Sequence, residues 1–117
     1  GNDSQNAGMS FRCNGTNSGV VRNSIVVGAD SASVDCSGPA FESNAVDESG
    51  LGGTNQMVGA FDAGWFANPG AGDFRLTSSG ETEFMDIAQW TDGDPLTDVD
   101  GEPVPIDMPS LPGYDQL

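Results

Sequence analysis

The sequence predicts an all-β fold built from stacked coils of a β-solenoid, and three observations lead to this prediction. First, Phe11 and Cys13 recur as Val34 and Cys36, each 23 residues later. Second, the chain is rich in turn formers, with 17 Gly and 7 Pro among its 117 residues. Third, no run has the apolar spacing of an amphipathic helix of normal length. A repeat of about two dozen residues, made of short β-type runs and polar turns, is typical of stacked coils.

The strands of the first two coils follow from residue type and alternation. Residues 9–13 alternate apolar and polar side chains, which indicates a short strand. Residues 20–27 are rich in β-branched side chains and form the strongest predicted strand. Residues 34–36 and 41–46 occupy the corresponding places in the next coil. Asn, Gly, Ser and Pro dominate the segments between them, as turns require.

A third, degenerate coil is expected further along the chain. Residues 47–56 are interpreted as a glycine-rich connection, and residues 57–61 and 65–67 as the strands of this coil. Phe61, Trp65 and Phe66 are expected to cluster there as a core or a cap, with a sugar-stacking platform as the alternative. Residues 81–90 suit one or two helical turns, and an extended strand fits them equally well.

Two pairs of side chains are expected to stack between neighbouring coils. Asn23 and Asn44 are predicted to form a structural ladder of hydrogen-bonded amides, with ligand contact as the alternative. Cys13 and Cys36 stand at the same place in the repeat. Strands about 4.8 Å apart permit a disulfide, and the alternative is a pair of reduced thiols stacked in the core.

The charge of the chain restricts its partners. Eighteen acidic residues against three arginines give a net charge of −15. Such a field repels phosphate backbones, which excludes nucleic acid, and it disfavours anionic membranes. No stretch approaches the ~20 apolar residues of a membrane span. The composition predicts a soluble surface in a saline or secreted setting.

The residue types also restrict the chemistry. The chain has no histidine and no lysine, which excludes Ser-His-Asp and Cys-His catalysis and zinc sites built on histidine. Asp92, Asp94, Asp98 and Asp100 cluster in a turn-rich stretch, and Ca²⁺ prefers such oxygen ligands. The sequence therefore indicates calcium as a candidate ligand at these four residues. The alternative is that the aspartates cap turns through hydrogen bonds to the backbone.

Residues 65–76 end on Gly-Asp-Phe-Arg-Leu, and residues 97–103 read Thr-Asp-Val-Asp-Gly-Glu-Pro. With these motifs, the chain resembles over about residues 20–117 the C-terminal region of bacterial secreted right-handed parallel β-helix (pectate-lyase-like) surface proteins. Residues 83–88 stand where the family has a proline-containing segment, but lack the proline, and residues 113–115 echo its closing signal. Such ends occur on adhesins, surface proteins and polysaccharide-degrading enzymes, so they indicate architecture more than function.

The resemblance implies a right-handed parallel β-helix of about three coils over residues 1–76. An irregular Pro/Asp-rich capping tail is expected over residues 77–117, packed on the helix. The expected function is a non-enzymatic extracellular structural, adhesive or assembly module at the bacterial cell surface. The alternative is the end piece of a polysaccharide lyase or glycosidase whose catalytic coils lie upstream or in another chain.

No catalytic residue is predicted in this chain. A lyase of this fold needs a base, and Arg12, Arg22 and Arg75 are its only basic side chains. The first coil is expected to face a partner, either preceding β-helix coils or another protein subunit, with a glycan as a further ligand. The residues predicted at this partner-facing end are Met9, Phe11, Val20 and Val21.

Overall fold

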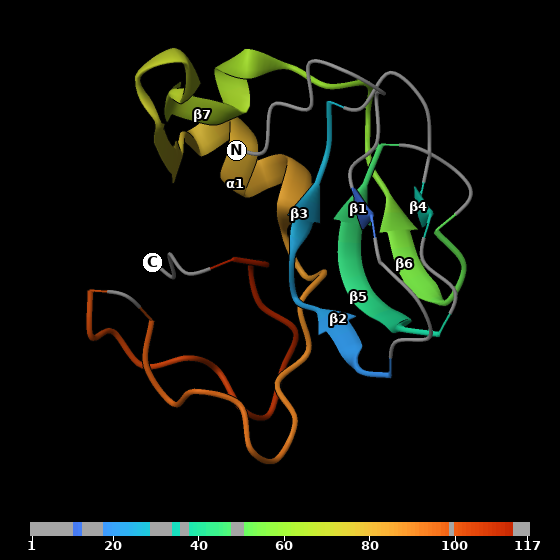
Figure 1. Ribbon diagram of the computed structural model, residues 1–117. Coiled ribbons are helices and arrows are strands. Elements are labelled where there is room, and N and C mark those ends of the chain that lie inside the picture. The colour runs from blue at the N-terminus through green and yellow to red at the C-terminus, as the bar shows by residue number, and fades with distance from the viewer. Residues whose placement is uncertain are drawn as a thin grey trace.

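The computed structural model describes residues 11–12, 18–28, 34–35, 38–47, 51–98 and 100–113. Within these ranges strands β1 to β6 lie together on one side, and the α-helix packs beside strand β7 on the other (Figure 1). The elements in chain order are β1 (Phe11–Arg12), β2 (Val20–Arg22), β3 (Ile25–Val26), β4 (Val34–Asp35), β5 (Ala40–Val46), β6 (Thr54–Met57), η1 (Ala63–Trp65), β7 (Phe66–Asn68), η2 (Pro69–Ala71), β8 (Asp73–Leu76) and α1 (Ser78–Phe84).

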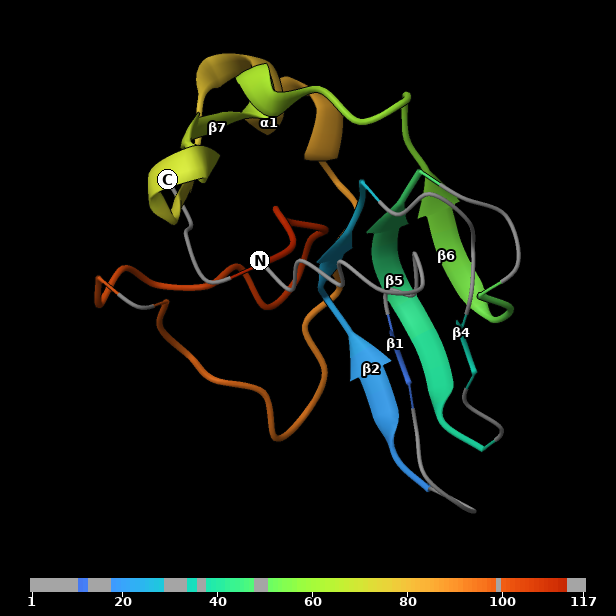
Figure 2. The ribbon, with the colours of Figure 1, turned by 45° about the horizontal axis from the view of Figure 1, so that its top comes forward.

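The main sheet is parallel and is centred on β5. Strands β2 and β3 follow one another along one side of β5, and β6 pairs with the other side (Figure 2). Residues 40–46 alternate in burial and then become fully buried at Asn44, Ala45 and Val46. The sequence prediction that residues 20–27 and 41–46 are neighbours is confirmed.

A shared bend separates β2 from β3. Asn23 has a φ of 53°, and Ser43 on β5 has a φ of 55°. The paired residues Arg22↔Glu42 and Ile25↔Ala45 place these two left-handed residues opposite each other. Asparagine tolerates this conformation better than most residues because its short side chain hydrogen-bonds locally. Both strands therefore change direction at the same level.

Strands β1 and β4 form a separate parallel pair. Phe11 lies beside Val34, and Arg12 lies beside Asp35. This is the register that the repeat predicts, so the parallel stacking of these two segments is confirmed. The predicted disulfide partners Cys13 and Cys36 lie outside the described residues, and the bond between them stays a prediction.

The second half of the fold packs a helix against an antiparallel pair. Strands β7 and β8 run antiparallel, with Phe66 beside Leu76. Helix α1 begins after Thr77, whose hydroxyl accepts a hydrogen bond from the Gly80 N–H at 3.3 Å. This is ordinary N-capping by threonine. The resulting core contains Ala45 of the sheet together with Trp65, Phe66, Phe84 and Ile87.

Gly80 allows α1 to approach the strands closely. A Cβ atom at this position would lie 2.3 Å from the carbonyl oxygen of Trp65 and 3.1 Å from a methyl group of Leu76. Only glycine fits so near another backbone. The ring of Phe84 then packs edge-to-face on Trp65, with 5.1 Å between the ring centroids.

The predicted all-β fold, a right-handed parallel β-helix of about three coils, is wrong. The structure is a small mixed α/β arrangement that combines parallel and antiparallel strands with helix α1. The number of residues between paired positions becomes smaller along the chain. Phe11 pairs with Val34, Val20 with Ala40, and Val46 with Met57. Such spacing leaves no constant period. Among the described residues, no third strand extends the β1–β4 pair.

Residues 57–67 do not form the expected third coil. The strand here is β6, which lies mostly within the predicted connection, and the chain then turns into η1. The Asp62 side chain caps η1 by accepting a hydrogen bond from the Gly64 N–H at 2.8 Å. Trp65 and Phe66 are buried as core side chains and not displayed as a sugar platform.

Residues 85–113, called the C-terminal segment below, carry no helix or strand in their described part. Their pairing is limited to isolated bridges between Ala88 and Ser110 and between Thr97 and Pro103. The segment loops away from α1 and returns beside the β2–β3 side of the sheet (Figure 1). Pro112 is fully buried, and Leu111 packs on the core.

Candidate functional site

Arg22 and Arg75 are each engaged with a carboxylate. Arg22 pairs with Asp94. Arg75 donates to both carboxylate oxygens of Asp73, through Nε at 2.9 Å and Nη2 at 2.6 Å. The hydrogen bonds from Arg75 lower the pKa of Asp73 to about 2. A guanidinium held in this way is a poor proton acceptor, so the geometry gives no support to a lyase base at Arg22 or Arg75.

The four aspartates predicted as calcium ligands do not converge on one point. Asp94 accepts from the Thr91 N–H at 2.9 Å and pairs with Arg22. One oxygen of Asp98 accepts from the N–H groups of both Asp100 and Glu102, at 2.9 and 2.8 Å. These are turn-capping contacts.

Across the part of the chain that the structure describes, no three carboxylates group as metal ligands. Asp92 and Asp100 are exposed. Calcium binding at residues 92–100 therefore stays a prediction, and it requires the caps of Asp94 and Asp98 to rearrange.

Asn23 and Asn44 do not form the predicted amide ladder; each side chain makes other hydrogen bonds. Asn44 is fully buried; its Nδ2 donates to Asn55 Oδ1 at 2.8 Å and to the Val21 carbonyl at 2.9 Å. Its Oδ1 accepts from the Ser24 N–H at 3.0 Å. The strand register places Asn44 opposite Ser24, one residue from the predicted partner.

Asn23 instead ties the sheet to the C-terminal segment. Its Oδ1 accepts from the Gln89 N–H at 2.9 Å, and its Nδ2 donates to the Gln89 carbonyl at 3.1 Å. Its own carbonyl accepts from the Gly113 N–H at 2.8 Å. Beside it, Arg22 pairs with Asp94. These four contacts, called the Asn23 clamp below, gather at the bend between β2 and β3.

The environment of Asp94 favours its charged form. Burial alone would raise its pKa, but the hydrogen bond from the Thr91 N–H and the guanidinium of Arg22 outweigh that effect. The pKa of Asp94 therefore lies below its ordinary value. The ion pair of the Asn23 clamp is intact at neutral pH.

The opposite side of the sheet ends on β6. The Val58 N–H donates to the Val46 carbonyl at 2.8 Å. Because successive residues of a strand direct their backbone groups to opposite sides, the N–H and C=O of Met57 face away from β5. No described residue hydrogen-bonds to them, and the Met57 side chain is 54% exposed. Residues 54–57 carry no charge in a chain of net charge −15.

The predicted partner-facing end is placed only in part. Met9 and the side chain of Phe11 lie outside the described residues. Val20 is 54% exposed, and Val21 is half-buried. Both belong to β2, which pairs with β5 on one side and with no other described strand.

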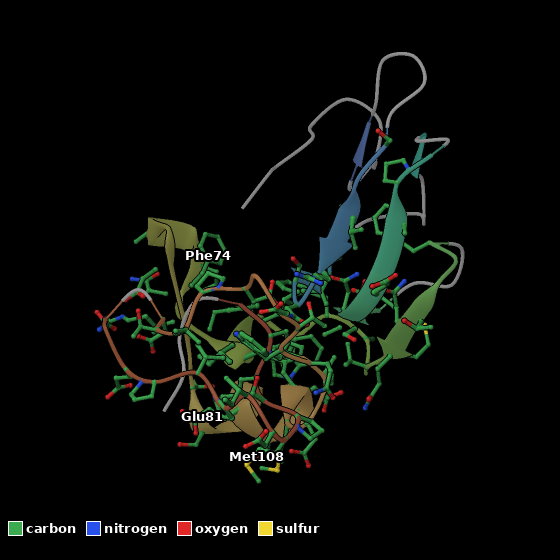
Figure 3. The ribbon with its side chains drawn as sticks, turned by 90° about the horizontal axis from the view of Figure 1, so that it is seen from below. Phe74, Glu81 and Met108 are labelled. Carbon is green, nitrogen blue, oxygen red and sulfur yellow. The ribbon has the colours of Figure 1, made fainter. Side chains whose placement is uncertain are left out.

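Exposed apolar side chains of the described residues come from several elements. Phe74 and Met108 lie on well-separated parts of the surface (Figure 3). The large apolar residues with high exposure come from many elements: Val20, Met57, Phe61, Phe74, Met85, Leu96, Ile106 and Met108. The free edge of β6 is therefore a better defined candidate for an interaction site than any apolar surface.

Sequence reasoning missed the role of β6. Residues 54–56 were assigned to a glycine-rich connection because glycines precede them. A usable signal was present, since Asn55 stands two residues before Met57 as Asn44 stands two residues before Val46. The actual amide contact joins Asn44 to Asn55.

Comparisons with protein-family models, curated proteins and solved structures found no match to this chain. The family resemblance of residues 20–117 thus stays a prediction. Within the described ranges, none of the helices is long and apolar enough to cross a bilayer.

Proposed function

We propose that this chain is a non-enzymatic structural or assembly module of a secreted or cell-surface protein. It joins another protein subunit by accepting an extended strand of that subunit at the free edge of β6. The observation that carries this proposal is the outward direction of the Met57 backbone groups, deduced from the Val58–Val46 hydrogen bond. Unpaired groups at a sheet edge are a template for strand addition.

Charge supports a protein partner of a particular kind. The chain carries −15, while β6 itself is uncharged. An incoming strand therefore meets no charged side chain on β6 itself. Basic residues on either side of the incoming strand would be attracted by the negative field of the rest of the chain. The same field disfavours nucleic acid and anionic membranes.

The residue inventory supports a module without catalysis of its own. Histidine and lysine are lacking, and Arg22 and Arg75 are held by Asp94 and Asp73. The acidic composition is the basis for proposing a secreted or cell-surface location.

A synthetic strand tests the proposal. The probe is a lysine-tagged peptide with the sequence of residues 20–27, which is the strand type that already pairs in this sheet. We expect it to bind the full chain and to slow hydrogen exchange of the Met57 amide, with NMR shift changes centred on residues 54–57. A scrambled peptide with the same tag controls for electrostatic attraction to the acidic chain.

Two variants at one position locate the contact. Met57→Pro removes the outward N–H, at an edge position where proline is tolerated, and is expected to weaken peptide binding at least tenfold. Met57→Ala keeps the N–H and is expected to bind within a few-fold of the parent chain. Equal binding of the scrambled peptide, or equal binding by the proline variant, would overturn the proposal.

A further inference from the structure

The two free sides of the main sheet are complementary in direction. Strands β2, β3, β5 and β6 all run parallel. The β6 edge of one molecule can therefore lie beside the β2–β3 edge of a second molecule and continue the parallel sheet. Such a head-to-tail contact uses two different surfaces and does not close, so it would propagate into chains of molecules.

The residues on these edges do not oppose such a contact. Strands β2 and β3 carry one charge, that of Arg22, and β6 carries none. The 18 acidic residues all lie outside these three strands. The strongest electrostatic obstacle to self-association is therefore the long-range repulsion of the net charge, which salt screens.

The C-terminal segment occupies one of the two edges. At the β2–β3 bend the backbone carbonyl of Asn23 accepts a hydrogen bond from the Gly113 N–H. The side-chain amide of Asn23 is hydrogen-bonded to the backbone of Gln89. Arg22, the preceding residue, is held by Asp94. The segment thus takes one backbone acceptor that an added strand would need, the Asn23 carbonyl, and its contacts with the two side chains hold it across this edge.

We propose that the C-terminal segment is an autoinhibitory strap, which keeps a second copy of this chain from adding its β6 edge to β2–β3. The inference rests on the proposed function, because it uses the same β6 edge. It adds that the opposite edge is a second assembly surface, exposed when the Asn23 clamp opens. Edge covering by a loop is a general way in which proteins prevent uncontrolled sheet extension.

The test opens the clamp with a double variant, R22Q/N23G. Arg22→Gln removes the ion pair with Asp94, and Asn23→Gly removes the amide contacts while keeping a φ of 53° accessible. The matched control is E42Q/S43G on β5. It makes the same kinds of change one strand away, at Ser43 with its φ of 55°, without touching the clamp.

Sedimentation velocity of the full chains is measured over a concentration series in about 0.5 M NaCl, where repulsion is screened. We expect the parent chain and E42Q/S43G to remain monomeric. The weight-average mass of R22Q/N23G should at least double with concentration. Adding Met57→Pro to R22Q/N23G should restore the monomer.

The possible outcomes separate the two proposals. A monomeric R22Q/N23G chain whose β6 edge still binds the peptide would overturn the strap alone. Failure of β6 to bind the peptide would overturn both. Association that persists with Met57→Pro would place the contact elsewhere and overturn the strap. If R22Q/N23G does not fold, Q89P/D94N opens the clamp from the segment side, with the same expectations.

Discussion

Replacing Asn44 by alanine should destabilise the fold strongly, because Asn44 is fully buried and its amide joins three parts of the sheet. Asn44→Ala removes three hydrogen bonds, to Val21, Ser24 and Asn55. At about 1 kcal/mol for each bond, the loss is about 3 kcal/mol. The unpaired Ser24 N–H and Val21 carbonyl that remain add to this loss. For a fold stabilised by about 5–15 kcal/mol, this is a large change.

The assay is urea unfolding followed by tryptophan fluorescence, since buried Trp65 reports on the core. Asn55→Ala is the matched control: Asn55 is half-buried and shares only one of the three Asn44 contacts. Asn55→Ala also removes the exposed hydrogen bond from Asn55 Nδ2 to the Gly52 carbonyl at 2.7 Å, so we expect it to cost about 1–2 kcal/mol. If Asn44→Ala costs no more than Asn55→Ala, the assignment of Asn44 as the central hydrogen-bonding residue is wrong.

Three further predictions concern other parts of the molecule. Gly80→Ala should lower the free energy of unfolding by about 1–3 kcal/mol, because its Cβ would lie 2.3 Å from the Trp65 carbonyl oxygen; a gain in thermal stability would refute the close approach. Arg22→Gln should cost up to about 1 kcal/mol at pH 7. The pKa of Asp94 is depressed in the folded chain, so the stabilising contribution of the ion pair is present above the ordinary pKa of 3.8 and is lost as the pH falls below that value. Urea unfolding of the parent chain and of Arg22→Gln at pH 7 and pH 2 checks this prediction. An equal difference in unfolding free energy between the two chains at both pH values contradicts it. If the calcium prediction holds, calorimetry should show Ca²⁺ binding to the parent chain, and Asp98→Asn should weaken this binding at least tenfold. A titration of the parent chain without a binding signal would refute the calcium prediction.

Local pairing was predictable from the sequence where the repeat is direct. Phe11 and Val34 occupy equivalent positions, and they pair in the expected register. The neighbouring strands of residues 20–27 and 41–46 were predictable from their β-branched and apolar content. Their register was not: the paired residues are 20 positions apart on both sides of the bend, whereas the alignment of Asn23 with Asn44 implies 21.

The overall fold was not predictable from the same repeat. A constant period requires coils of equal length, but the chain between β5 and β6 is short, and the next residues enter η1 and α1. Helix α1 spans seven residues, too few for a periodic apolar pattern to identify it. Its position depends on the contact of Gly80 with Trp65, which only the tertiary structure shows.

The candidate site was partly hidden for a similar reason. The Asn23 clamp joins residues more than sixty positions apart, Asn23 with Gln89 and Gly113. The sequence predicts a structural role for Asn23, but no pattern in the neighbouring residues indicates a partner so far along the chain. The edge of β6 was hidden because Gly50, Gly52 and Gly53 precede it, and glycines are typical of turns.

Hydrogen exchange of two adjacent amides in the free chain tests the central claim most directly. The account predicts that the Val58 amide, bonded to the Val46 carbonyl, is protected, while the Met57 amide exchanges at close to the rate of an unstructured peptide. A Met57 amide that is already as well protected as that of Val58 would mean that the β6 edge is covered, and would contradict both the proposed function and the strap.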